Sequence, residues 1–300
     1  MKKQSYDIHS DITNRIIAAI EAGAGPFRMP WHGAGTMQVP RNAVTRKAYR
    51  GINVLSLWIT AQERAYSCAK WATFRQWQVT GAAVRKGEKA TPIVFYKQIE
   101  LDSGADSAEA KTVPFARASW VFNAAQVEGY AAEAPPARAP TVFERLDHAE
   151  ASIKATRAAI AYGGNRAYYD RGTDRIQVPD ASSFIGSLTS TPRESFYGTV
   201  LHELAHWSGA KSRLNREKGK RFADRIYAFE EIIAELSAAF SCARLGITDT
   251  PRDEHAQYIS QYLEILRSDK KAVFIAAAAA ATATDYILAF LDAPPESEAA

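Results

Sequence analysis

The sequence has few cysteines and no apolar segment near its start. Cys68 and Cys242 are the two cysteines among 300 residues. This number is too small for a disulfide framework, so we expect a reducing cytoplasm. Two lysines near the start are not followed by an apolar stretch, which argues against a secretory signal. Hydrophobic residues make up 47% and charged residues 23%, which excludes a mostly disordered chain, a collagen-like fibre or a coiled-coil rod.

Long apolar runs are also scarce. Residues 272–291 form one run of the length needed to cross a bilayer. The run is rich in alanine, contains Asp285 and lacks aromatic belts at both ends. We therefore expect a buried helix and no membrane partner.

Charge is divided unevenly along the chain. Residues 1–97 contain 15 Lys and Arg against 5 Asp and Glu, a net charge of +10, whereas the whole chain has +4. Five of the six tryptophans lie in the first 120 residues. This asymmetry predicts different partners for the two halves.

An Ala- and Pro-rich stretch at 131–140 predicts an extended linker between two domains, 1–130 and 141–300. We expect an α+β protein with a mixed α/β first domain and a mostly helical second domain. The predicted elements of the first are helices at 7–22, 52–65 and 71–79 and strands at 90–99 and 118–122. Those of the second are helices at 141–161, 192–207, 228–245, 254–266 and 272–291 and a hairpin at 167–178.

The strongest chemical signal is His202-Glu203-Leu204-Ala205-His206, an H-E-x-x-H pattern. Four residues make about one helical turn, so both imidazoles lie on the same face of a helix and can bind one metal ion. Glu203 then lies beside the metal and is the candidate general base. The alternative is a helix that carries two polar histidines on its surface.

A third ligand is expected on the next helix. Glu231 and Glu235 are four residues apart and share a face. We favour Glu231 as the ligand and Glu235 as the group that orients a histidine, and the reverse assignment stays open. Glu230 is expected to point elsewhere, and His255 is a weaker candidate.

The pattern resembles the zincin metallopeptidases whose third ligand is a glutamate, because Glu231–Glu235 fits their E-x-x-A-x segment. The resemblance implies metal-assisted amide hydrolysis, with the hairpin at 167–178 supplying an edge strand for substrate. Zn²⁺ is the expected cofactor, while Mn²⁺ or another first-row ion also suits these ligands.

The first half intersperses cations with aromatic rings between residues 49 and 97. Cations can follow a phosphate backbone while rings stack on exposed bases, so this composition predicts binding of single-stranded nucleic acid. Core packing of the tryptophans is the competing interpretation. The candidate contacts are Arg50, Asn53, Lys70, Trp71, Phe74, Arg75, Arg85, Lys86, Lys89 and Tyr96.

Four segments of this half resemble the N-terminal domain of the ArdC-type antirestriction proteins. They are Tyr49-Arg50-Gly51-Ile52-Asn53-Val54-Leu55, Trp71-Ala72-Thr73-Phe74-Arg75-Gln76, Val84-Arg85-Lys86-Gly87-Glu88-Lys89 and Val121-Phe122-Asn123-Ala124-Ala125-Gln126. The resemblance implies a domain that binds single-stranded DNA followed by a zincin-like domain. It further implies protection of incoming conjugative plasmid DNA from host restriction. A host restriction protein or another protein substrate is a further candidate partner.

Two alternatives remain at this point. One is a DNA-binding protein whose metal site is only structural. The other is a metallopeptidase whose basic domain recruits a protein substrate.

Overall fold

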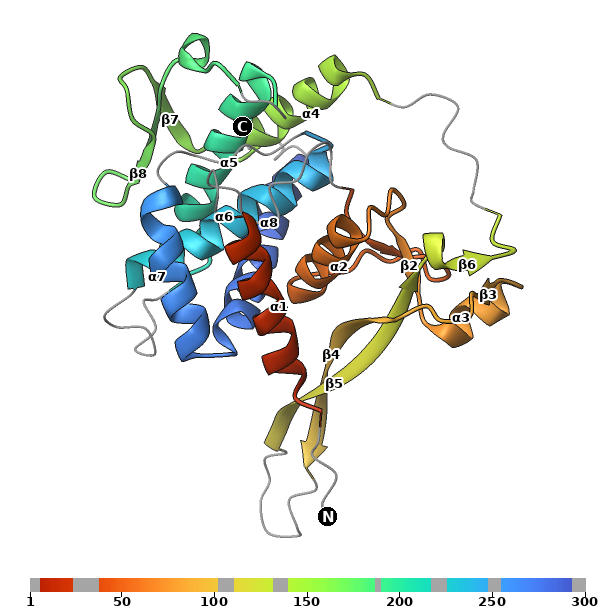
Figure 1. The fold of residues 1–300 in the computed structure, drawn as a ribbon. Helices are drawn as coiled ribbons and strands as arrows, with labels where there is room; N and C mark the ends of the chain where they lie inside the picture. The colour runs from red at the N-terminus through yellow and green to blue at the C-terminus, as the bar shows by residue number, and fades with distance from the viewer. Residues whose placement is uncertain are drawn as a thin grey trace, which may run out of the picture.

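A computed structural model describes residues 6–23, 38–101, 111–131, 140–186, 190–216, 226–247 and 255–292 (Figure 1). The fold is α+β with two domains, which confirms the expected fold class. Most of the expected linker, residues 132–139, lies outside the described part of the chain.

The first half contains a four-stranded sheet of order β1-β2-β5-β4 and a separate β3–β6 pair. Strands β4 and β5 form a long antiparallel ribbon that extends away from the helices (Figure 1). The helices are α1 (Ile8–Gly23), α2 (Ile52–Glu63) and α3 (Phe74–Val79). The strands are β1 (Arg41–Asn42), β2 (Lys70–Ala72), β3 (Ala83–Val84), β4 (Thr91–Leu101), β5 (Lys111–Asn123) and β6 (Val127–Glu128).

The predicted helices at 7–22 and 52–65 and both predicted strands are confirmed. The prediction of a helix over 71–79 is wrong for its first three residues, because the helix begins at Phe74. Trp71 pairs with Asn123 across the sheet, and Thr73 starts α3 by accepting a hydrogen bond from the amide of Gln76. This reciprocal cap explains where the strand ends and the helix begins.

The described part of the second half contains five α-helices and a small sheet of order β7-β9-β8. The helices are α4 (Val142–Ala155), α5 (Pro192–Ser208), α6 (Ile226–Leu245), α7 (His255–Ser268) and α8 (Ala272–Asp292). The strands are β7 (Ala159–Tyr162), β8 (Tyr168–Asp170) and β9 (Arg175–Val178). The predicted hairpin is confirmed as β8–β9, whereas the helix expected to reach residue 161 ends at Ala155 because β7 pairs in parallel with β9.

Helix α5 has clear start and stop signals. The Thr191 hydroxyl accepts a hydrogen bond from the amide of Glu194, whose carboxylate accepts one from the amide of Thr191. Pro192 occupies the first turn and Gly209 follows the last. These signals fix the helix that carries both candidate histidine ligands.

One hydrophobic core joins the two halves. The isoleucine stripe of α1 and the apolar residues of α2 pack together with α6, α7 and α8. Its fully buried members include Ile12, Ile16, Leu55, Leu57, Ile93, Leu236, Ile265, Ala276 and Ala277. Helix α6 therefore has one face in this core and another in a second core with α4, α5 and β9.

Helix α8 is the one described helix that is long and apolar enough to cross a membrane by composition. Half of its apolar window is buried, and its residues belong to both cores. Near Ala277 it comes close to Gly51, where a Cβ would lie 3.4 Å from the Ala277 carbonyl oxygen. Gly51 also has a φ of +55°, which favours glycine. Helix α8 thus occupies the position of a core helix.

We expect Leu57→Ala to destabilise both halves together, because Leu57 is fully buried in the shared core. The expected loss is about 2–5 kcal/mol of unfolding free energy. Denaturant unfolding, followed by fluorescence and by circular dichroism, should show one transition at a lower midpoint. Val79→Ala, at an exposed position of α3, is the control. A second transition that keeps the wild-type midpoint would contradict the shared core.

Candidate metal centre

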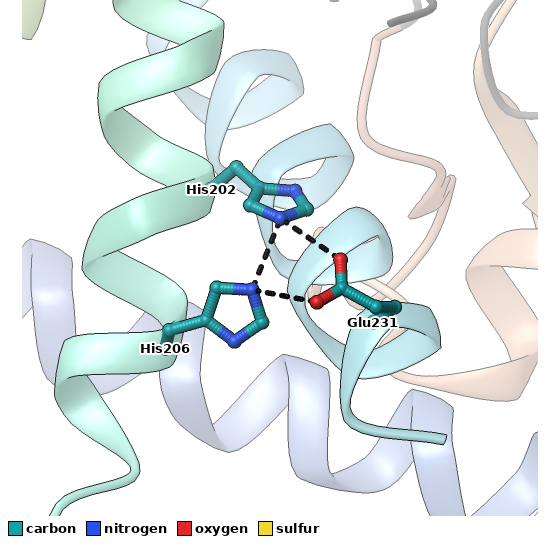
Figure 2. A group of neighbouring side chains, drawn as sticks. All are labelled: His202, His206 and Glu231. Carbon is teal, nitrogen blue, oxygen red and sulfur yellow. Dashed lines mark hydrogen bonds and ion pairs between the residues drawn. The ribbon is translucent and has the colours of Figure 1, made fainter. Parts of the chain in front are cut away.

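Helices α5 and α6 pack side by side and present three side chains to one point (Figure 2). His202 and His206 lie one turn apart on α5, and Glu231 faces them from α6. Among the described residues, these three form the group of His, Cys and carboxylate side chains suited to holding a metal ion.

The distances between the donor atoms fit a divalent cation. The two Nε2 atoms are 3.1 Å apart, and each lies 3.4 Å from one carboxylate oxygen of Glu231. Ligand atoms about 2.0–2.2 Å from an ion are separated by about 3.3–3.5 Å in tetrahedral geometry and about 3 Å in octahedral geometry. The observed triangle spans these values, so the donor set suits a divalent metal without selecting Zn²⁺.

Two further carboxylates contact the outer ring nitrogens. Glu235 lies 3.1 Å from Nδ1 of His202, as expected for a group that orients a ligand. Glu230 lies 3.5 Å from Nδ1 of His206, so the expectation that it points elsewhere is wrong. Successive helical residues are about 100° apart, and Glu230 and Glu231 straddle the side of α6 that faces His206.

Arg216 holds Glu230 in this position. Its Nη2 donates to the Glu230 carboxylate at 2.6 Å, and its Nη1 donates to the Ser208 hydroxyl at 2.8 Å. A Cβ at Gly209 would lie 2.6 Å from the guanidinium, so the absence of a side chain there admits the arginine. The loop after α5 therefore supports the site through Glu230.

The site is strongly charged. Burial lowers the pKa of His206, but hydrogen bonds to Glu230 and Glu231, together with the charge of Glu203, raise it to about 10. Burial raises the pKa of Glu231, but hydrogen bonds from His202 and His206 reverse this effect and lower it overall. The acidic groups thus form an environment that favours positive charge between the rings.

Glu203, the candidate general base, is buried beside the first histidine. Its charge is the smallest of the contributions that raise the pKa of His206, after those of Glu230 and Glu231. The structure therefore brings His202, His206, Glu231 and Glu235 together, and Glu203 follows His202 directly in the buried part of α5.

A positioned edge strand accompanies the site. Strand β8 pairs only with β9 among the described strands, so its other edge carries no described ladder partner. Arg213 ties this hairpin to α5: it donates to Asp174 at 3.0 Å and to the Tyr169 hydroxyl at 3.0 Å. It also donates to the Trp207 carbonyl at 2.6 Å, and its guanidinium stacks 4.1 Å from the Trp207 ring.

Several predicted nucleic-acid contacts have structural partners. Trp71 is 1% exposed, so its ring lies in the core and is not available to a base. The Asn53 side chain hydrogen-bonds the Val94 backbone through both its donor and its acceptor. Lys70 is half-buried near the Tyr130 ring, and Arg50 forms an ion pair with Asp285.

Other candidates are exposed. Phe74 is 49% exposed and adjoins the exposed Arg75 on α3. Arg85, Lys86 and Lys89 lie on an exposed turn, in which the Glu88 amide donates to the Arg85 carbonyl and Gly87 has a φ of +88°.

Neighbouring groups limit the positive charge of this turn. Glu88 lies 2.8 Å from the Arg85 guanidinium. A hydrogen bond from Gln126 lowers the pKa of Glu88 and so keeps it ionised. Lys86 and Lys89 are therefore freer than Arg85 to meet a phosphate.

Two exposed groups were missing from the candidate contacts. Phe95 is 51% exposed on β4, directly opposite the exposed Arg117 on β5. The sequence alone does not give the register of β4 against β5, so it could not predict that Phe95 and Arg117 lie opposite each other. The side chains of Tyr96 and His255 lie outside the described part of the chain.

Two family models match the chain. Residues 6–122 match the N-terminal domain of the antirestriction factor ArdC, and residues 147–279 match a zincin-like metallopeptidase domain. The crystal structure of antirestriction protein ArdC of plasmid R388, metal-free, is 37% identical with a TM-score of 0.76. The match covers 96% of this chain and 98% of that one. The chain belongs to the ArdC family of antirestriction proteins.

Other members and relatives agree with this assignment. The Mn(II)-bound structure of the R388 ArdC protein is 36% identical with a TM-score of 0.75. Protein y4eC of Sinorhizobium fredii, described as uncharacterized, is 41% identical over 94% of this chain and 91% of its own length. DNA primase TraC of Escherichia coli is 35% identical over 94% of this ArdC-family chain, but the match spans only 20% of TraC.

We expect His206→Ala to abolish stoichiometric metal binding, because it removes one of three ligands. His148→Ala, at an exposed position of α4, should bind metal like the wild type. Glu235→Gln and Glu230→Gln should each weaken metal affinity by about 10–100-fold. Elemental analysis and competition with a chelator measure these effects. Full metal content in His206→Ala would contradict the site.

We expect Arg213→Ala to loosen the β8–β9 hairpin while leaving metal content unchanged, because it removes the contacts to Asp174 and Tyr169. Hydrogen exchange should rise at 168–178. Lys211→Ala, an exposed neighbour, is the control. Unchanged exchange in Arg213→Ala would show that the arginine does not hold the strand.

Proposed function

We propose that this ArdC-family protein binds single-stranded DNA through its first half and holds a divalent metal in a peptidase-like site in its second half. In this proposal it acts in the cytoplasm and protects incoming conjugative plasmid DNA from host restriction. The observation that carries the metal part is the triangle of His202, His206 and Glu231 on two packed helices. The Mn(II)-bound R388 ArdC protein, at 36% identity, supports a divalent metal in this family.

The chain's own residues suit amide hydrolysis. A divalent cation, when bound, supplies a Lewis acid and an acidic water. His202, His206 and Glu231 would hold it, while Glu235 and Glu230 fix the two rings. In this proposal Glu203 would accept a proton and return it to a leaving amine. The edge of β8 that pairs with no other described strand would offer backbone groups to an extended peptide.

DNA binding is supported by charge and exposed rings. The first half carries a net charge of +10 over residues 1–97. Phe74, Phe95 and Trp120 are each about half exposed, among exposed cations such as Arg75 and Arg117. Rings that stack on bases and cations that meet phosphates bind single strands with little sequence preference. The match of residues 6–122 to the ArdC N-terminal domain supports the same assignment.

A second candidate function is DNA binding with a metal that only stabilises the fold. It is favoured by the position of α6, which carries Glu231 and also contributes Ile232 and Leu236 to the shared core. Loss of the metal would then weaken the junction of the halves.

We expect the double variant Arg75→Ala/Lys86→Ala to bind single-stranded oligonucleotides several-fold more weakly for every base sequence. The slope of log affinity against log salt should decrease by about 0.7 for each lost phosphate contact. The matched control is Arg171→Ala/Lys211→Ala, which removes two exposed cations from the second half. An equal loss in both double variants would contradict a DNA surface on the first half.

We expect Glu203→Gln to keep its metal and its DNA affinity, because it removes only the proton acceptor. Comparing this variant with Arg75→Ala/Lys86→Ala in a plasmid-transfer assay against a restricting host separates the alternatives. Loss of protection in both variants supports hydrolysis coupled to DNA binding. Protection that survives Glu203→Gln but not the double variant indicates a structural metal. The reverse result indicates a peptidase that does not need DNA.

A further inference from the structure

An open cleft lies between the β8–β9 hairpin and the loop that follows α5. Its volume is about 470 Å³, within the range of ligand-binding sites. The end of β8 and the turn after it form one wall, and the loop forms the other. The lining residues are Tyr169, Arg171, Asp174, Ala210, Lys211 and Ser212. The cleft therefore adjoins both the edge strand and the end of the helix that carries the histidine ligands.

We propose that this cleft binds an acidic side chain of an extended peptide, and that Arg171 and Lys211 select for its carboxylate. The inference rests on the proposed peptidase-like site and names the class of substrate that the site would take, a protein segment that contains Asp or Glu. None of the lining residues is a metal ligand, so the cleft is a separate feature of the second half.

The cleft begins close to the metal centre. Helix α5 ends at Ser208, two residues after His206, and Ala210 is the first residue of the loop in the lining. Four helical residues span about 6 Å, so the lining starts about one helical turn beyond His206. An extended peptide advances about 3.3 Å per residue. A peptide paired with the edge of β8 would thus reach the cleft within a few residues of the bond held at the metal.

The lining has an excess of positive charge. Arg171 and Lys211 are exposed, and no described residue forms a hydrogen bond or an ion pair with either side chain. Asp174 is the carboxylate in the lining, and Arg213 donates to it at 3.0 Å and lowers its pKa. Because Arg213 already compensates Asp174, the two remaining cations are left to meet a carboxylate of a ligand.

The turn that presents Arg171 is held in place. The Asp170 carboxylate accepts hydrogen bonds from the Gly172 amide at 2.8 Å and from the Thr173 hydroxyl at 2.7 Å. These bonds engage the acidic neighbour of Arg171 within the turn. A cation on a fixed turn loses less conformational freedom on binding than one on a mobile loop, which favours a specific contact.

The surroundings favour a peptide over DNA. Residues 98–300 carry a net charge of −6, the difference between +4 for the whole chain and +10 for residues 1–97. A long polyanion is therefore repelled by the second half as a whole, whereas a single carboxylate needs only the local pair of cations. The adjoining edge strand offers backbone groups that an extended peptide can match and a nucleic acid cannot.

The binding test uses full-length Glu203→Gln loaded with Mn(II), so that a bound peptide stays intact. The probes are short fluorescent peptides of Ala and Thr that carry Glu, and matched peptides in which Gln or Lys replaces Glu. Fluorescence anisotropy at fixed salt gives the affinities. The Glu peptide should bind about threefold to tenfold more tightly than the Gln peptide, as expected for one or two exposed ion pairs, and the Lys peptide should bind most weakly.

Charge reversal in the same background tests the two cations. Arg171→Glu/Lys211→Glu should invert the order, so that the Lys peptide binds most tightly, a gain that misfolding cannot produce. Arg193→Glu/Lys271→Glu changes the charge equally at exposed positions outside the cleft and should keep the preference for Glu. Arg75→Ala/Lys86→Ala should also keep it, whereas loss of the preference there would place the acidic peptide on the first half and overturn the inference.

The outcomes separate this inference from the proposed function. Wild type with Mn(II) is incubated with the same peptides, and mass spectrometry detects cleavage. Equal binding of the three peptides, no binding of any of them, or an order that Arg171→Glu/Lys211→Glu does not change overturns the inference, even if cleavage occurs. An order that reverses in this variant, without cleavage of any peptide by the wild type, supports the acidic subsite and contradicts hydrolysis.

Discussion

The packing of α5 against α6 is the contact on which the rest of the site depends. It places two imidazoles from one helix against a carboxylate from the other, with Nε2 to oxygen distances of 3.4 Å. Glu230 and Glu235 on α6 lie at the outer nitrogens of the same two rings. These five charged or polar side chains can be accommodated away from solvent because each has a partner of opposite character. The helix pair and the charged cluster therefore stabilise each other.

Helix α6 connects this cluster to the first half. Its apolar residues Ile232 and Leu236 lie in the core shared with α1 and α2, while Ala234 and Cys242 lie in the core with α5. A helix with two buried faces has little freedom to move relative to either neighbour. The position of Glu231 is consequently set by residues from both ends of the chain.

Local signals in the sequence predicted much of the fold. The isoleucine spacing predicted α1, and Thr191, Pro192 and Gly209 predicted both ends of α5. The pairing of β7 with β9 was not predicted, because parallel pairing joins residues with no local turn signal between them. The facing of α6 toward α5 was anticipated from the spacing of Glu231 and Glu235. The contact of Glu230 with His206 depends on Arg216, which lies in a loop that has no periodic pattern.

The DNA-contact residues were harder to predict, because composition does not distinguish a buried ring from an exposed one. Trp71 is buried and Phe74, three residues later, is half exposed. Within the segments that resemble the ArdC family, the side chains of Asn53, Gln76, Asn123 and Gln126 hydrogen-bond the backbone of strands and turns. These four side chains therefore have structural roles in the resembling segments. We expect DNA to contact the exposed residues beside them.

The shared core has a consequence for how such chains are inherited. A fragment cut between the halves would expose the apolar faces of α2 and α8 to water and would aggregate or unfold. Recombination that moves one half alone is therefore disfavoured, whereas transfer of both together preserves every buried contact. The matches to TraC fit this expectation, since they cover 94% and 97% of this chain, with both halves included, within much longer proteins.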